Sequence, residues 1–154
     1  MASRRRAREY ALQALYQSDL GKVPVMDALH GLWAGLMDDE GIDGLRVPES
    51  SEVEFAQRLV CGVEQHRDAI DVLIDECSTN WRLMRMPVVD RNIVRLAGFE
   101  LMTCKDIPSS VSINEAIELA KRFGSADSRA FVNGLVDRMA RQLGRISSPS
   151  GRRK

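Results

Sequence analysis

Apolar residues recur three and four positions apart along almost the whole chain, which is the spacing of one face of an α-helix. We find no stretch with the strict alternation of apolar and polar side chains that a half-buried strand needs. The pattern therefore predicts an all-α fold, with about seven helices and short connections between them.

The first two predicted helices precede an acidic, glycine-rich stretch at 38–44, which we expect to be a loop. The first helix runs from about Ser3 to Leu20 and ends at Gly21. Pro24 starts the second, and its apolar stripe consists of Val25, Ala28, Leu29, Leu32, Trp33 and Leu36.

Ser51 and Glu54 have the spacing of a capping box and predict the start of a third helix. A short fourth helix follows directly, and its inward residues are Ala69, Ile70, Leu73, Ile74 and Cys77. The pattern leaves the structure of the segment 81–86 open.

The second half of the chain has its own start and stop signals. Pro87 is well placed to begin a helix, which the stretch 107–110 interrupts. Ser112 and Glu115 form a second capping box, and Gly124 ends the helix that it opens.

Asp127 or Ser128 caps the last predicted helix, and Gly144 ends the regular structure. Its buried side consists of Phe131, Val132, Leu135, Val136, Met139 and Leu143, and its outward side carries Arg138, Arg141 and Arg145. Residues 1–144 are thus expected to form one domain made of two bundles, at about 1–78 and 79–144. The tail at 145–154 offers little apolar surface to bury, so we expect it to be disordered.

The composition is that of an ordinary globular protein, with 154 residues, 44% hydrophobic and 29% charged. A net charge of zero argues at first against a nucleic-acid-binding protein. The charge is unevenly distributed, however: it is +4 over residues 1–8, −11 over 9–120 and +7 over 121–154. The 22 basic residues are 18 Arg and 4 Lys, a bias toward the side chain that binds phosphate bidentately.

Nothing in the sequence predicts a metal, a cofactor, a disulfide or a membrane segment. Cys61, Cys77 and Cys104 are odd in number and far apart, so they are expected to be buried thiols. No apolar run is long enough to cross a bilayer, and the N-terminal charges have no apolar region behind them. The expected location is the cytoplasm.

The sequence also offers poor material for catalysis. His30 and His66 are the only histidines, and neither has a second metal ligand or catalytic partner near it in sequence. The nucleotide-binding, zinc-protease and serine-hydrolase motifs are all missing. We therefore predict no catalytic residues.

Clustered arginines are the first positive signal. Arg4, Arg5 and Arg8 share one side of the first predicted helix, and Arg6 extends the patch. These charges repel one another and the positive end of the helix dipole, which favours a role in binding a polyanion. The alternative is a solvated run of charge.

Further candidates for contacts with nucleic acid lie along the same helix and at the other end of the chain. Tyr16 offers an aromatic face, although a tyrosine beside an apolar stripe is more often part of a core. Lys121, Arg122 and Arg129 form a second basic patch, with Phe131 close by. If the two patches meet in the fold, they form a groove for single-stranded nucleic acid.

The sequence resembles the NusB family of bacterial transcription antitermination factors over nearly its whole length. The more specific block runs from Val111 to Lys121 and on through Phe123-Gly124 and Asp127-Ser128 to Phe131-Val132-Asn133-Gly134. The other blocks are Arg4-Arg5-Arg6-Ala7-Arg8-Glu9 and Ala11-Leu12-Gln13-Ala14-Leu15-Tyr16.

The resemblance implies two perpendicular three-helix bundles and no catalytic activity. It implies binding to the boxA element of ribosomal RNA leader transcripts, together with the ribosomal protein NusE, in the antitermination complex on RNA polymerase. By position, the RNA surface would comprise Arg4, Arg5, Arg6, Arg8, Tyr16, Asp127, Arg129 and Phe131. Asp90 matches an acidic family position that faces the protein partner.

Three questions stay open on the sequence. The oligomeric state varies in the family, and a homodimer that covers the arginine surface is one alternative to a monomer. Similar helical domains also begin some ribosomal RNA cytosine methyltransferases, so the chain is alternatively a detached domain of that kind. A third alternative is a protein-interaction module in which the arginines are merely solvated.

Overall fold

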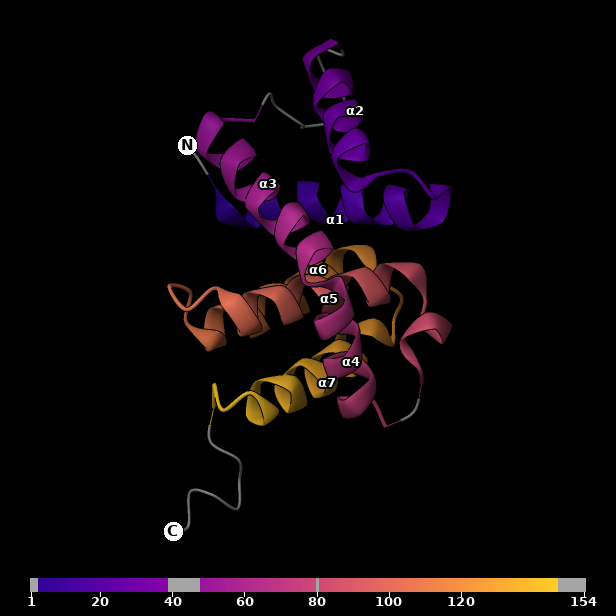
Figure 1. Cartoon of the computed structure of the whole chain (residues 1–154), viewed down its shortest axis with the longest axis vertical. Helices are drawn as coiled ribbons and strands as arrows, with labels where there is room; N and C mark the ends of the chain where they lie inside the picture. The colour runs from indigo at the N-terminus through magenta and orange to yellow at the C-terminus, as the bar shows by residue number, and fades with distance from the viewer. Residues whose placement is uncertain (1–2, 39–47, 80, 147–154) are drawn as a thin grey trace. The chain divides into compact units, whose positions relative to one another are not determined.

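The computed structural model of the chain describes residues 3–38, 48–79 and 81–146, and within these ranges every regular element is helical (Figure 1). The elements are α1 (Arg4–Gly21), α2 (Val25–Asp38), α3 (Ser50–Gln65), α4 (Arg67–Cys77), the 3₁₀ turn η1 (Leu83–Arg85), α5 (Val88–Thr103), α6 (Ser109–Phe123) and α7 (Ser128–Gln142). The all-α prediction is confirmed. The predicted loop at 38–44 lies outside the described residues except for Asp38, and so does the tail after residue 146.

The chain divides into two units, Met1–Gln65 and His66–Lys154, which are described separately below. The sequence suggested a boundary near residue 78, one helix later. The difference arises because α4 packs against α5 and α7 and so belongs to the second unit. Unit 1 therefore holds three of the described α-helices, and unit 2 holds four.

Unit 1 is built on α1, which packs against both α2 and α3. The buried face of α1 is rich in small side chains, and this lets the neighbouring helices approach closely; it includes Ala7, Ala11, Ala14 and Leu15. Tyr10 is also buried and meets Trp33 edge-to-face, with ring centroids 5.1 Å apart.

A buried carboxylate joins the starts of α1 and α3. The Ser3 backbone N–H donates to Glu52 Oε2 (2.7 Å), and the Glu49 backbone N–H donates to Glu52 Oε1 (3.1 Å). The predicted capping box of Ser51 and Glu54 is therefore wrong. Helix α3 begins two residues earlier than that box requires, and the Glu52 side chain reaches back to accept from the Glu49 backbone N–H.

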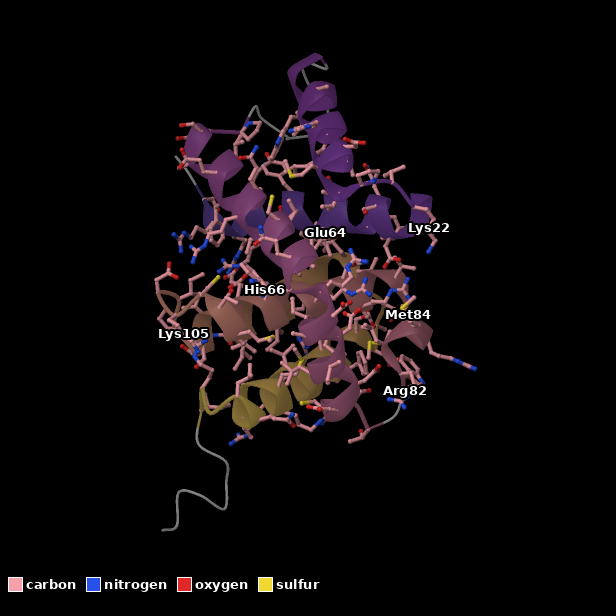
Figure 2. All side chains as sticks on the ribbon, viewed as in Figure 1. Lys22, Glu64, His66, Arg82, Met84 and Lys105 are labelled. Atoms are coloured by element: carbon pink, nitrogen blue, oxygen red, sulfur yellow. The ribbon has the colours of Figure 1, made fainter. Side chains whose placement is uncertain are left out.

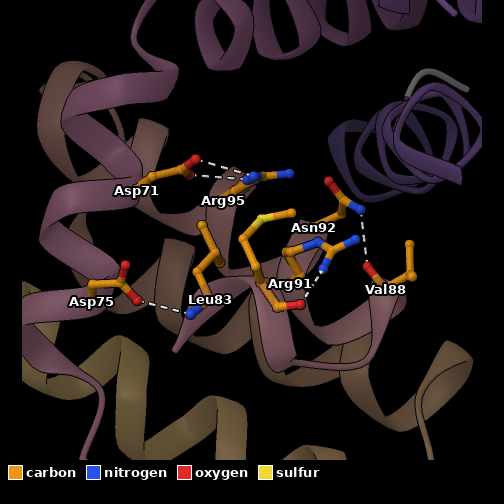
Figure 3. Close-up of polar contacts among 8 residues, drawn as sticks. Asp71, Asp75, Leu83, Val88, Arg91, Asn92 and Arg95 are labelled. Carbon is orange, nitrogen blue, oxygen red and sulfur yellow. Dashed lines mark hydrogen bonds and ion pairs between the residues drawn. The ribbon is translucent and has the colours of Figure 1, made fainter. Parts of the chain in front are cut away.

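The central helix of unit 2 is α5, which packs against α4, α6 and α7 and is buried at every residue from Asp90 to Leu101. Its arginines are held by acceptors (Figure 3). Arg95 Nε and Nη2 donate to the two oxygens of Asp71 at 3.0 and 3.1 Å, and Arg91 Nη1 donates to the Met84 carbonyl. Because these side chains have partners, α5 can be buried despite its charge.

The segment 81–86, for which the sequence pattern made no prediction, contains the short 3₁₀ turn η1 and is hydrogen-bonded to α4. The Leu83 backbone N–H donates to Asp75 Oδ1 (2.8 Å), and the Leu83 side chain is buried (Figure 3). The exposed Arg82 and Met84 side chains extend from the same turn (Figure 2).

Two sequence predictions in unit 2 are corrected. Helix α6 already begins at Ser109, because Pro108 has a backbone suited to a helix start, and Ser112 instead donates its hydroxyl to Glu100 Oε1 (2.7 Å). Arg145 is not an outward side chain. Its Nη1 and Nη2 donate to the carbonyls of Leu101 and Ile107 at 2.6 and 2.9 Å, and this ties the end of α7 to the turn after α5.

Candidate nucleic-acid interface

The four N-terminal arginines have different surroundings at the start of α1. Arg4 and Arg5 are exposed, Arg6 is half-buried and Arg8 is buried. The guanidinium carbons of Arg4 and Arg8 lie 4.3 and 5.3 Å from the centroid of the Phe55 ring on α3. Arg4, Arg5 and Arg6 are therefore accessible to a ligand, and Arg8 belongs to the packing of unit 1.

Tyr16 lies three turns further along α1 and keeps 37% of its surface exposed. It is not part of the core, where Tyr10 takes the aromatic position instead. An exposed ring next to a helix with accessible arginines has the chemistry needed to stack on an unpaired base.

The C-terminal candidates lie on the first turn of α7 or just before it. Asp127 and Arg129 are exposed, and Phe131 is half-buried. Phe131 lies against Trp81, with ring centroids 5.4 Å apart and an angle of 44° between the planes.

Trp81 was not among the sequence-predicted site residues. It keeps 48% of its surface exposed, and so forms an open aromatic pair with Phe131. The signal available in the sequence was a tryptophan set between polar residues, Thr79-Asn80 before it and Arg82 after it, where a core residue is not expected.

A hydrogen-bonded serine fixes the start of α7. Ser128 Oγ accepts from the Ser125 backbone N–H (2.9 Å) and donates to Asp90 Oδ1 on α5 (2.7 Å). Burial raises the pKa of the Asp90 carboxyl above its ordinary value, and the Ser128 hydrogen bond opposes that rise. The structure thus gives Asp90 a buried partner inside unit 2, whereas the resemblance assigned it to a protein partner.

Gly124 makes this arrangement of Ser128 sterically feasible. A Cβ atom at Gly124 would lie 2.5 Å from both Cβ and Oγ of Ser128, and 2.8 Å from the Ala120 carbonyl oxygen. Helix α6 therefore ends at a residue without a side chain, and α7 can begin within four residues.

Lys121 and Arg122, the other members of the second basic patch, are exposed in the last turn of α6. Lys121 Nζ lies 3.7 Å from Glu118 Oε2, and the guanidinium carbon of Arg122 lies 5.4 Å from the Phe123 ring centroid. Unit 2 thus presents cations and an aromatic pair around the start of α7.

The two groups of candidates belong to different units: Arg4, Arg5, Arg6, Arg8 and Tyr16 to unit 1, and Asp127, Arg129 and Phe131 to unit 2. Their joint groove remains a prediction. Within the described part of the chain, no three metal-ligating side chains gather into a site. None of the helices described is long and apolar enough to cross a membrane.

A family model and the similar proteins of known name both point to one family. The NusB family model matches residues 5–141. The transcription antitermination protein NusB of Myxococcus xanthus is 50% identical over 140 residues, which cover 91% of this chain and 96% of that protein.

Solved structures agree in fold. NusB of T. maritima aligns with a TM-score of 0.79 and 37% identity, over 92% of this chain and 94% of that one. NusB in a solved complex of the antitermination factors NusB and NusE with double-stranded RNA aligns with a TM-score of 0.76, over 90% and 96% of the two chains. Since the identity to this second structure is 23%, it supports the fold alone.

Proposed function

The chain belongs to the NusB family of transcription antitermination proteins, and on that premise we propose that it binds the boxA element of ribosomal RNA leader transcripts as single-stranded RNA. The protein is an antitermination factor and not an enzyme. The methyltransferase alternative receives no support, because the Myxococcus xanthus relative described above is an antitermination protein.

One observation carries the proposed RNA contact. Arg4 is exposed at the start of α1, and its guanidinium carbon lies 4.3 Å from the centroid of the Phe55 ring. A planar guanidinium that is already positioned loses little freedom when it binds a phosphate. Arg5 and Arg6 extend the same surface, and each phosphate they neutralise releases counterions.

Sequence preference needs contacts other than those to phosphates, because phosphates carry no base identity. We assign this role to aromatic rings: Tyr16 on α1, and Phe131 with Trp81 in unit 2. Unpaired bases can stack on such rings and expose their edges to neighbouring polar groups, here Asp127 and Arg129.

A protein partner of basic character fits the acidic middle of the chain, which carries −11 over residues 9–120. We propose the ribosomal protein NusE as that partner and the antitermination complex on RNA polymerase, in the bacterial cytoplasm, as the place of action. This choice is based on membership of the NusB family. In the solved complex described above, NusB is found together with NusE and double-stranded RNA. Because Asp90 is buried, it can contact this partner only if binding exposes its side chain.

Fluorescence anisotropy of a labelled boxA RNA tests the proposal. We expect tighter binding to boxA than to a scrambled strand of equal length, and a further gain when NusE is added. A boxA strand annealed to its complement separates single-strand from duplex recognition. Equally weak binding to the boxA and scrambled strands, with and without NusE, would leave only the protein-interaction alternative.

The oligomeric state is tested on the same samples by analytical ultracentrifugation. A homodimer that covers the arginines would dissociate as boxA RNA is added, since the two would compete for one surface. A monomer would bind RNA without such a change.

A further inference from the structure

Three guanidinium groups surround a single aromatic ring in unit 1. The guanidinium carbons of Arg4, Arg8 and Arg58 lie 4.3, 5.3 and 5.9 Å from the Phe55 ring centroid. The ring attracts each cation, but the cations repel one another. Such a cluster is most stable when an anion is added to it.

A pocket of about 430 Å³ opens beside this cluster, at the starts of α1 and α3. Arg4 lines it from α1, and Arg58 and Phe55 line it from α3. The positive ends of both helix dipoles lie at the same place and favour a negative ligand. This volume is in the range of sites that bind a small ligand or one nucleotide.

Two acidic residues also line the pocket, and they limit the charge of the ligand. The Glu52 carboxylate is already bound by the backbone N–H groups of Ser3 and Glu49. Glu54 is exposed and lies one turn before Arg58 on α3, a spacing at which the two side chains interact. A ligand with a single negative charge therefore fits better than one with several.

We propose that this pocket binds one backbone phosphate of the RNA, held by Arg4 and Arg58 together. The inference rests on the proposed function and adds Arg58, a residue of α3 outside the predicted arginine cluster, to the RNA-binding surface. A phosphodiester carries one charge and offers two oxygens to planar guanidinium groups. Phe55 acts as a positioning residue that holds both cations before the RNA arrives.

The first test replaces the cation. Arg58→Gln removes the charge from an exposed position, so the fold is expected to persist. We expect boxA affinity to fall on the order of fivefold, as for the loss of one exposed charged hydrogen bond. The slope of log affinity against log salt should become shallower by about 0.7, the value for one phosphate of a single strand. Lys105→Gln, which removes an exposed cation from unit 2, is the matched control and should change neither quantity.

Three further variants separate the roles of charge and geometry. Arg58→Lys keeps the charge and loses the planar fork, so the salt slope should stay while the affinity falls in part. Glu54→Gln removes the competing carboxylate and should strengthen binding. Phe55→Leu keeps an apolar side chain and removes no charge, yet should weaken binding as much as Arg58→Gln; its fold is checked by circular dichroism.

The outcomes distinguish this inference from the proposed function. If Arg58→Gln binds boxA with unchanged affinity and salt slope, while Arg5→Gln with Arg6→Gln weakens binding, the pocket does not hold a phosphate and RNA binding still stands. Equal losses in the Arg58→Gln and Lys105→Gln variants would also overturn the inference, because the effect would then be one of overall charge. If the unaltered protein fails to prefer boxA, the proposed function itself fails.

Discussion

Asp90 and Arg95 are charged residues buried on the same helix, and their environments differ. Asp90 is held by one hydroxyl donor, that of Ser128, and burial raises its pKa. Arg95 is 3% exposed and forms a bidentate pair with Asp71, whose side chain is 26% exposed. The two residues therefore affect stability differently. Asp90 makes the stability depend on pH, and Arg95 holds α5 to α4.

We predict that the difference in stability between the Asp90→Asn variant and the unaltered protein grows with pH. Because its pKa is raised in the folded state, its favourable contribution is complete below the ordinary value of 3.8 and is lost as the pH rises through the raised pKa. Asp90→Asn stays neutral and can still accept from Ser128. We expect this variant to be more stable than the unaltered protein near pH 7 and the difference to shrink toward pH 4, as measured by urea unfolding. A difference that is constant over this range would contradict the assignment.

The Arg95–Asp71 pair should contribute far more to stability than a less buried pair of the same chemistry. Arg95→Ala leaves Asp71 without its partner and should lower the free energy of unfolding by roughly 3 kcal/mol. Arg141 forms the matched pair, with Nε 2.9 Å from Asp137 Oδ2 at i,i+4 spacing and side chains 30% and 38% exposed. Arg141→Ala should cost less than about 0.5 kcal/mol. Equal costs in urea unfolding would mean that burial does not set the value of the Arg95 pair.

The connection between α6 and α7 shows how two helices share one short turn. Gly124 ends α6, Ser125 donates to Ser128, and Ser128 is anchored on Asp90. Exposed Arg129 and the Phe131 ring follow directly. The candidate RNA residues of unit 2 are thus placed by a turn that has no room for a side chain at Gly124.

Two glycine substitutions test this turn. Gly124→Ala puts a Cβ 2.5 Å from Ser128, so the turn must shift at a cost of about 1–3 kcal/mol, and boxA affinity should fall with it. Gly134→Ala lies inside α7, where a Cβ would meet only the Arg138 Nη1 at 3.5 Å. That control should gain roughly 0.5–1 kcal/mol from reduced backbone freedom and leave RNA binding unchanged. Thermal unfolding and anisotropy of both variants give the answer, and a Gly124→Ala protein of normal stability would refute the steric account.

Most helices could be predicted from the sequence because their apolar stripes are long and regular. Helix starts were harder. The Ser51/Glu54 and Ser112/Glu115 spacings match a capping box, but neither pair forms one. At the start of α3 the buried acceptor is Glu52, which accepts from the backbone N–H groups of Ser3 and Glu49. Ser112 donates its hydroxyl to the buried Glu100. A donor 49 residues away in sequence leaves no local pattern.

The candidate site residues that are adjacent in sequence and share a charge could be predicted. Those that come together only through tertiary packing could not. Arg4, Arg5 and Arg6 stand out by their spacing. Arg58 is a single arginine on an ordinary amphipathic helix, and only its place beside Phe55 distinguishes it. Trp81 likewise gains significance from the Phe131 ring against which it lies.

For the protein as a whole, the zero net charge is the sum of regions with opposite character: +4, −11 and +7 along the chain. The basic regions at the two ends belong to different units, and each presents cations next to aromatic rings. We propose that both ends bind the same RNA and that the acidic region faces a basic protein partner.

The most direct test is a titration of one labelled boxA RNA with three forms of the protein. The first is unaltered, the second has Arg4, Arg5 and Arg6 changed to Gln, and the third has Arg129→Gln with Phe131→Ala. Arg8 is left in place because it is buried.

We predict one protein bound per RNA and weaker binding by both altered forms. The arginine variant should lose at least about tenfold in affinity, with a salt slope shallower by roughly 2 for three lost phosphate contacts. An arginine variant that binds boxA with the affinity and salt slope of the unaltered protein would contradict the account.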